Sequence, residues 1–185
     1  MTATTAPVRL APGRWTTDPG RTEASFRVGN LGRTVRGTVQ VTSGELDVDD
    51  AGRPVAVRAV LDLGTVATGH PRRDADLRRP GLLDAEGHPA MTFECGAVRV
   101  VPGGWCADGR LGLRGTTCPL PVTGGVQDDS TADRVHVVGT ATLDRTAAGI
   151  RAPRLLIGRT VTVTVDAWLT PPGRVSGGSA TPAAS

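Results

Sequence analysis

The sequence predicts an all-β protein of about eight antiparallel strands. Apolar and polar residues alternate along most of the chain, so that each segment has one apolar and one polar face. Strands with one wet face are typical of antiparallel sheets. The 25 glycines and 14 prolines supply many turns and disfavour long helices. Such strands fit a closed barrel or a β-sandwich, and periodicity alone does not separate the two.

The first half of the chain contains three alternating runs. In "PVAVRAVLDL" (54–63) the apolar residues share one face, with Arg58 and Asp62 on the other. Two shorter runs precede it. The apolar faces of the three predicted strands consist of Ala24, Phe26, Val28, Val35, Val39, Val41, Val55, Val57, Ala59, Leu61 and Leu63.

The second half repeats the pattern. Long alternating runs are "DRVHVVGTATLDR" (133–145) and "RTVTVTVDAWLT" (159–170), and "RLGLRG" (110–115) is a shorter one. In "MTFECGAVRVV" (91–101) the alternation slips by one residue at Gly96, which predicts a β-bulge.

One charged segment near 70–84 interrupts the strands, and we expect it to be helical. Pro71 suits the first helical position, and Pro80 prevents the helix from continuing. About two turns remain, which are too short to be stable without packing. Asp74 and Arg78 have the spacing of an ion pair on the exposed side of a helix.

Leu77, Leu82 and Leu83 provide this segment with an apolar underside. We expect the segment to act as a plug or lid at one end of a barrel, with its leucines over the interior. The alternative is that it only caps a filled core.

One domain over residues 13–170 is expected, with disordered tails at 1–12 and 171–185 that are rich in small residues and proline. The first residues lack the apolar core of a signal peptide. No run approaches the roughly 20 apolar residues of a membrane-spanning helix. We therefore expect a cytoplasmic protein.

The chain has three cysteines, Cys95, Cys106 and Cys118. Their spacing is not that of a zinc site, and their odd number argues against a disulfide framework. We therefore expect three reduced cysteines, mostly buried. The net charge is +3, every positive charge is an arginine, and acids are interleaved with the arginines. Because aromatic residues make up only 3% of the chain, nucleic-acid binding is not indicated.

Several short motifs occur in order between residues 15 and 169. They are "WTTDP" (15–19), "SFRV" (25–28), Arg73–Asp74 with Leu77, "HPAMTF" (88–93), "GLRGTTCPL" (112–120), and "LDR" (143–145) followed by Gly149–Ile150. Together they resemble the YceI-like, polyisoprenoid-binding, lipocalin-like proteins. The resemblance implies a lipocalin-like antiparallel barrel with an elongated apolar cavity for an isoprenoid chain. It also implies no shared catalytic residues, no cofactor other than a bound polyisoprenoid or quinone-type lipid, and a possible homodimer.

The resemblance and the alternation together select candidate ligand-binding residues for the cavity wall or lid. They are Phe26, Leu61, Leu63, Leu77, Leu82, Leu83, Phe93, Leu113, Leu143, Ile150 and Val163. Arg73 and Asp74 are expected at the cavity mouth, where they bind a head group or fix the helix against a strand. The chain departs from the family pattern, which has aromatic residues at Leu82 and Leu83, phenylalanine at Ala148 and often histidine at Asp76. These smaller side chains predict a reshaped cavity.

Two other functions stay open: a small enzyme acting on an apolar intermediate at the barrel mouth, and a filled barrel that serves only for interactions. No Gly-x-Ser-x-Gly motif is present, and we expect a protein without catalytic activity. A metal site at Asp84, Glu86 and His88 is not favoured, because these residues fall in a predicted turn.

Overall fold

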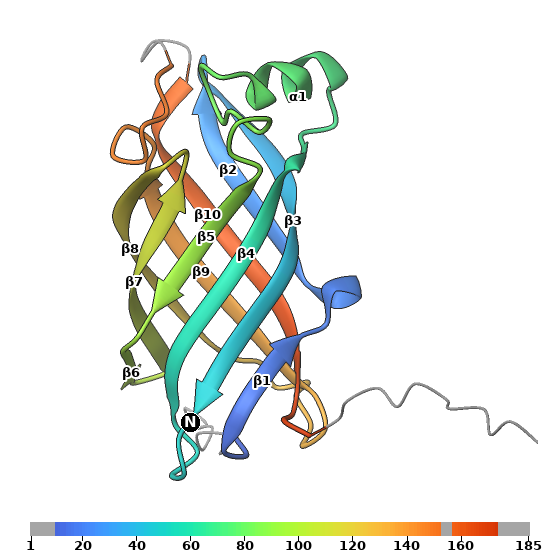
Figure 1. The fold of residues 1–185 in the computed structure, drawn as a ribbon, viewed down its shortest axis with the longest axis vertical. Coiled ribbons are helices and arrows are strands. Elements are labelled where there is room, and N and C mark those ends of the chain that lie inside the picture. The colour runs from blue at the N-terminus through green and yellow to red at the C-terminus, as the bar shows by residue number, and fades with distance from the viewer. Residues whose placement is uncertain (1–9, 153–156, 174–185) are drawn as a thin grey trace, which may run out of the picture.

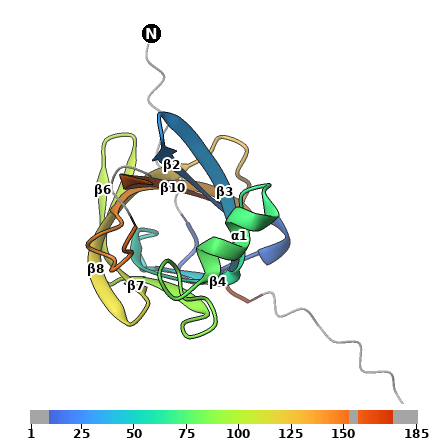
Figure 2. The same ribbon diagram turned by 90° about the horizontal axis from the view of Figure 1, so that it is seen from above.

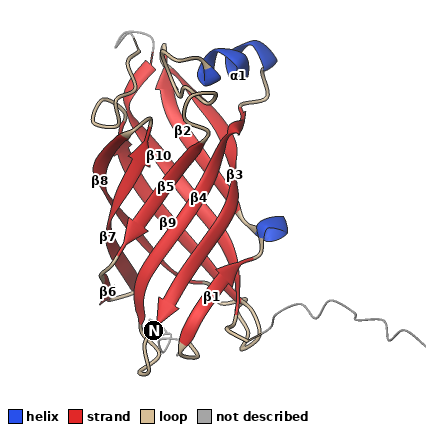
Figure 3. Cartoon of the chain, viewed as in Figure 1, coloured by secondary structure: helices blue, strands red, loops and turns tan. Residues whose placement is uncertain are grey.

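A computed structural model describes residues 10–152 and 157–173 of the chain (Figure 1). Nearly all of its regular structure is β-strand (Figure 3). The elements in chain order are β1 (Gly13–Thr17), the 3-10 turn η1 (Pro19–Arg21), β2 (Glu23–Asn30), β3 (Arg33–Val48), β4 (Pro54–Ala67), α1 (Pro71–Arg78), β5 (Ala90–Cys95), β6 (Val98–Val101), β7 (Gly104–Leu113), β8 (Thr116–Val126), β9 (Val135–Asp144) and β10 (Ile157–Thr170).

The strands close into an eight-stranded antiparallel barrel. The path β10–β2–β3–β4–β5–β7–β8–β9 returns to its start because β9 also pairs with β10 (Figure 2). The remaining two strands are short: β1 pairs with the ends of β3 and β10 that β2 leaves free, and β6 pairs with β7 beyond the end of β5. Closure resolves the choice between barrel and sandwich and leaves the main strands without a free sheet edge along most of their length.

The predicted alternation is confirmed except at Val55, which is 38% exposed beside a register shift in the β3–β4 ladder. Along β9 and β10 the apolar residues face inward, and the polar residues between them face outward. A β-bulge was predicted at Gly96, and there β5 ends at Cys95, β6 begins at Val98 and the pairing with β7 slips by one residue. All three cysteines are free, with Cys95 and Cys118 buried.

A cluster of buried side chains closes the barrel end opposite α1. Its members are Leu10, Trp15, Val48, Val135 and Leu169. Trp15 is 1% exposed, and its indole Nε1 donates a hydrogen bond to the carbonyl oxygen of Ala11 at 2.9 Å. Leu10, which the sequence placed in a tail, is therefore part of the core, whereas residues 1–9 and 174–185 lie outside the described part of the chain.

The helix α1 lies at the other end of the barrel (Figure 1). It begins at Pro71, as predicted, and ends at Arg78, one residue before the position at which Pro80 was expected to stop it. The predicted ion pair between Asp74 and Arg78 is wrong. Arg78 instead donates to the carbonyl oxygen of Val66 at 2.9 Å, which ties the helix to the end of β4. None of the helices in the described ranges is long and apolar enough to cross a membrane.

Candidate functional site

The inner wall of the barrel has an apolar surface that the core covers only in part. Phe26, Val28, Val35, Val161 and Val163 occupy inward positions on β2, β3 and β10, and all five are half-buried. The strand register makes them neighbours: Val163 lies opposite Phe26, and Val28 lies opposite both Val161 and Val35. We call these five residues the inner apolar patch.

Other inward positions are fully covered. Buried residues among the predicted site are Leu61, Leu63, Phe93, Leu113 and Leu143. They pack in two clusters on β4, β5, β7 and β9, which share partly buried neighbours such as Leu83. Their contact with a ligand stays a prediction, whereas Phe26 and Val163 of the same set belong to the inner apolar patch.

The patch is incompletely buried because the interior in front of it is not filled by other side chains. Val161 and Val163 lie on a strand that is paired on both sides, by β2 and β9. Inward side chains at such positions are buried when the interior in front of them is filled, as Leu61 is at 4% exposure.

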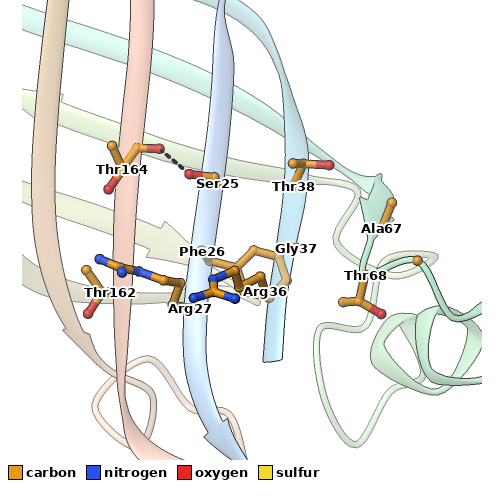
Figure 4. A pocket seen from close by; sticks show the side chains of 11 residues that line it. Ser25, Phe26, Arg27, Arg36, Gly37, Thr38, Ala67, Thr68, Thr162 and Thr164 are labelled. Carbon is orange, nitrogen blue, oxygen red and sulfur yellow. Dashed lines mark hydrogen bonds between the residues drawn. The ribbon is translucent and has the colours of Figure 1, made fainter. Parts of the chain in front are cut away.

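A hollow of about 540 Å³ lies next to this patch, a volume in the range of small-molecule sites (Figure 4). It is lined by Ser25, Phe26, Arg27, Arg36, Gly37, Thr38, Ala67, Thr68, Gly69, Thr162 and Thr164. Phe26 and Gly37 stand at inward positions, whereas the serine, the arginines and the threonines of β2, β3 and β10 stand at outward positions. The hollow therefore takes its lining from both faces of the sheet.

The register explains why the wall is incomplete there. The β3–β4 ladder ends with the pair Thr38–Ala67, but β3 continues for five more residues to Arg33. A register shift between Thr38 and Gln40 precedes this end of the ladder. Between Arg33 and Gly37, β3 therefore pairs only with β2, and the hollow lies at the place where β4 leaves the wall.

Two arginines stand side by side in the hollow. Arg27 and Arg36 are direct cross-strand partners at outward positions (Figure 4). Like charges placed directly opposite each other destabilise a sheet. Within the described ranges neither guanidinium forms a hydrogen bond or an ion pair. The hollow thus combines an apolar floor at Phe26 with a positively charged rim.

Arg73 and Asp74, the residues predicted at the cavity mouth, are both bound to Thr68 in the wall of the hollow. Arg73 donates from Nε to the Thr68 hydroxyl at 2.7 Å and from Nη2 to its carbonyl oxygen at 3.1 Å. Asp74 accepts from the Thr68 hydroxyl and from its backbone N–H. The hydroxyl hydrogen bond holds the pKa of Asp74 below its usual range. This geometry fixes α1 against β4.

The three leucines of the predicted lid lie between the helix and the barrel. Leu77 and Leu83 are half-buried and pack against the buried cluster that also contacts Phe26. Leu83 reaches the second cluster as well, and its N–H donates to the carbonyl oxygen of Leu77 at 2.9 Å. Leu82 is half-buried. The segment therefore covers this end of the barrel with apolar side chains, and its role as a lid over a ligand stays a prediction.

Arg145 is the structural residue that sequence reasoning missed. It is 2% exposed and donates from its guanidinium to carbonyl oxygens on both arms of the β9–β10 connection. The acceptors are Ile150, Ala152, Ile157 and Gly158, at 2.8–3.0 Å. This holds Ile150, a predicted site residue, half-buried against the core at the rim. Its place in the "LDR" motif was the available signal.

A second group of polar side chains lies on the outer wall. His136 contacts Asp129 through Nδ1 at 2.7 Å and Asp166 through Nε2 at 2.8 Å, and its ring stacks on Trp168. Partial burial alone lowers the pKa of His136, but the two carboxylates outweigh it, so the pKa is raised. Because a carboxylate contacts each ring nitrogen, neither nitrogen is free to accept a proton from a substrate.

Cys118 does not have the properties of a catalytic nucleophile. Burial raises the pKa of its thiol, which is the opposite of activation. His88, at the predicted turn, contacts Asp84 through Nδ1 at 3.0 Å.

Comparison with known proteins places this geometry in a family. Residues 15–169 match the model of the YceI-like domain. Among curated proteins, UPF0312 proteins of Yersinia pestis and Yersinia pseudotuberculosis are 33% identical over 98 residues, which is 51% of this chain and 50% of theirs. The chain thus spans about half the length of the curated relatives it matches.

Solved structures show the same fold. Burkholderia cenocepacia BcnA superposes with a TM-score of 0.73 at 15% identity, covering 82% of this chain and 98% of BcnA. A polyisoprenoid binding domain from Saccharophagus degradans gives a TM-score of 0.66 at 16% identity, with 85% and 98% covered. The YCEI protein of Campylobacter jejuni gives 0.58 at 14% identity, with 70% and 79% covered.

Proposed function

Because the chain belongs to the YceI-like family, we propose that it binds an isoprenoid or a similarly long apolar lipid inside the barrel and carries or sequesters it. The observation that carries this proposal is the inner apolar patch, whose residues on β2 and β10 are half-buried although both strands are paired at both sides. The polyisoprenoid binding domain of the same fold supports the choice of ligand class.

The energetics of such binding do not need strong polar contacts. Each buried methylene contributes roughly 0.8 kcal/mol, so about fifteen buried carbons contribute about 12 kcal/mol. Association costs at least about 4 kcal/mol in lost freedom. An apolar chain against Phe26 and Val163 is therefore held without a charged anchor, which accounts for a site built mainly of valine, leucine and phenylalanine.

The polar groups near the site support binding rather than catalysis. Arg73 and Asp74 direct their hydrogen bonds to Thr68, and they brace the lid.

We further propose that the protein works in the cytoplasm, which its three unpaired cysteines favour. Fractionation of the native host, followed by detection of the protein, tests the location.

Native mass spectrometry of the protein purified from its own host tests the ligand. We expect a mass increment that disappears after organic extraction and an apolar lipid in the extract. Val163→Trp fills the inner apolar patch and should abolish the increment, and Val28→Phe should weaken it. Thr142→Trp places the same ring at an outward position of β9 and is the matched control.

Thermal unfolding of each variant shows whether it folds, so that a loss of lipid can be assigned to the patch. A wild-type protein that carries no lipid and does not bind added polyprenol or quinone would overturn the proposal. Retention of the lipid by both folded patch variants would also do so.

A further inference from the structure

The tip of the β2–β3 hairpin exposes a large apolar side chain to water in a strained backbone conformation. Leu31 is 69% exposed, the highest value among the exposed large apolar side chains of the described residues. Leu31 and Gly32 form the two-residue turn, with φ of 47° and 76°. A turn with two positive φ values favours Asn-Gly, because a branched side chain is strained in the left-handed region. Leucine at this position is both strained and exposed to water.

The part of the hairpin nearest its tip carries an unbalanced positive charge. Residues 24–44 contain Arg27, Arg33 and Arg36 and no aspartate or glutamate, a charge of +3 that equals the net charge of the whole chain. Within the described residues, no carboxylate pairs with these three arginines.

Arginines at the opposite end of the barrel form ion pairs with carboxylates. Arg14 and Arg58 both contact Glu45 and Asp47, and Arg53 contacts Asp49. The arginines of the hairpin therefore differ from those at the other end of the barrel in having no carboxylate partner in the described part of the chain.

We propose that the β2–β3 hairpin docks the barrel on an anionic lipid bilayer, with Leu31 inserted and Arg27, Arg33 and Arg36 on the lipid phosphates. Apolar side chains surrounded by basic residues bind in this way at the interface of a bilayer with anionic lipids. Arginine suits the role because its planar guanidinium binds phosphate oxygens bidentately.

The dimensions of the hairpin fit the depth of the interface. Arg27 lies four residues before Leu31, about 13 Å along the strand. A strand tilt of about 35–45°, usual for barrels, reduces this to about 10 Å along the barrel axis. Interfacial side chains enter a bilayer by about 5–10 Å. When Leu31 is inserted, the guanidinium groups of Arg27 and Arg36 therefore reach the level of the phosphates.

Docking at this end places the candidate site at the membrane. The hairpin tip and α1 lie at the same end of the barrel (Figure 1), and Arg27 and Arg36 line the hollow beside Phe26 (Figure 4). Docking there would bring the hollow to the bilayer that holds the lipid, and in this respect the inference rests on the proposed function. Binding of the hairpin to a bilayer can be tested without any bound lipid.

Co-sedimentation of the full chain with vesicles tests the docking surface. The vesicles consist of phosphatidylcholine alone or of phosphatidylcholine and phosphatidylglycerol in equal amounts. We expect binding to the anionic vesicles that weakens as sodium chloride is added, because salt screens the attraction. Arg27→Gln with Arg36→Gln should lower the partition coefficient about fivefold for each arginine removed. Leu31→Ser should lower it about tenfold.

Two variants provide matched controls. Arg110→Gln removes an exposed arginine of β7, and Val100→Ser removes an exposed valine (57%) of β6 at the opposite end. Both should bind the vesicles as the wild type does. Equal binding to neutral and anionic vesicles, no binding at all, or equal losses in the control variants would overturn the inference.

Native mass spectrometry of Leu31→Ser separates the two proposals. Because Leu31 is 69% exposed in the turn and is not part of the inner apolar patch, the variant should retain co-purifying lipid while losing vesicle binding. Loss of dimers in this variant with unchanged vesicle binding would assign the tip to self-association and contradict the inference. Absence of lipid from the wild type, together with normal vesicle binding, would contradict the proposed lipid binding but not the docking surface.

Discussion

The ring of Phe26 lies over Gly37, its cross-strand partner on β3. A Cβ atom added at Gly37 would overlap the Cζ atom of this ring and lie 2.7 Å from the carbonyl oxygen of Ala67. Phe93, the other phenylalanine of the chain, covers Gly109 on β7. Glycine at these positions leaves space for an aromatic ring over the neighbouring strand, a device that also stabilises the glycine.

Gly37→Ala should therefore lower the free energy of unfolding by about 1–3 kcal/mol, the usual cost of overpacking. The added methyl group meets a backbone carbonyl that cannot move aside and a ring that can do so only by leaving its site. Urea denaturation measures the change. Gly29→Ala on β2 is the control, because no atom lies within 4 Å of its added Cβ. Equal losses in the two variants would contradict this account.

Arg145 leads to the second prediction. Four carbonyl oxygens depend on its guanidinium, and a buried acceptor without a partner costs about 1–3 kcal/mol. Arg145→Met keeps the length of the side chain but removes every donor, so we expect a loss of about 3 kcal/mol or more in unfolding free energy. Arg145→Lys should restore little of it, since one ammonium cannot replace a planar fork.

Arg159→Met is the control for charge. Arg159 is 66% exposed and pairs with Asp144 on the outside of the barrel. Exposed ion pairs contribute at most about 1 kcal/mol. If Arg145→Met were no more destabilising than Arg159→Met, the connection between β9 and β10 would not depend on Arg145.

The strand pattern was predictable because a half-buried strand needs only local information. The alternation along 133–145 and 159–170 shows which side chains point inward, whatever strand lies beside them. Pro71 and Pro80 likewise predict both ends of α1 from steric rules that act within a few residues. The family resemblance provided closure of the barrel, which periodicity does not.

The rest depends on distant parts of the chain. Helical spacing predicts a pair between Asp74 and Arg78, but the end of β4 provides better partners for both. The hollow arises from the early end of the β3–β4 ladder, which is a matter of register and not of residue type. Sequence reasoning also treated all inward residues as equal, whereas Leu61 is buried and Val163 is half-buried.

A third prediction concerns the attachment of the lid. The hydroxyl of Thr68 joins Arg73 and Asp74 to the end of β4, so Thr68→Val should loosen α1. We expect faster amide hydrogen exchange over residues 71–83 and faster release of bound lipid, with a loss of unfolding free energy of about 1–2 kcal/mol.

Thr42→Val is the matched control, because the Thr42 hydroxyl donates to the carbonyl oxygen of Val60 on the wall, away from the lid. Its exchange rates over 71–83 should equal those of the wild type. Unchanged exchange in Thr68→Val would show that the leucines alone hold the segment in place.

The fourth prediction concerns pH and His136. The hydrogen bonds to Asp129 and Asp166 outweigh partial burial and raise the pKa of His136 in the folded protein. The folded state thus binds the proton more tightly than the unfolded chain, in which the pKa is about 6.5. The resulting stability is fully present below about pH 6.5 and is lost as the pH rises through the folded-state pKa.

The unfolding free energies of the wild type and of His136→Gln should therefore differ most near pH 6 and converge at alkaline pH. The two carboxylates are half exposed, 58% for Asp129 and 51% for Asp166, so the pH-dependent part should not exceed about 1 kcal/mol. Urea denaturation across this pH range measures the difference. Titration of the His136 ring by NMR in Asp166→Asn should show a lower pKa than in the wild type. A stability difference that grows with rising pH would contradict a raised pKa of His136 in the folded protein.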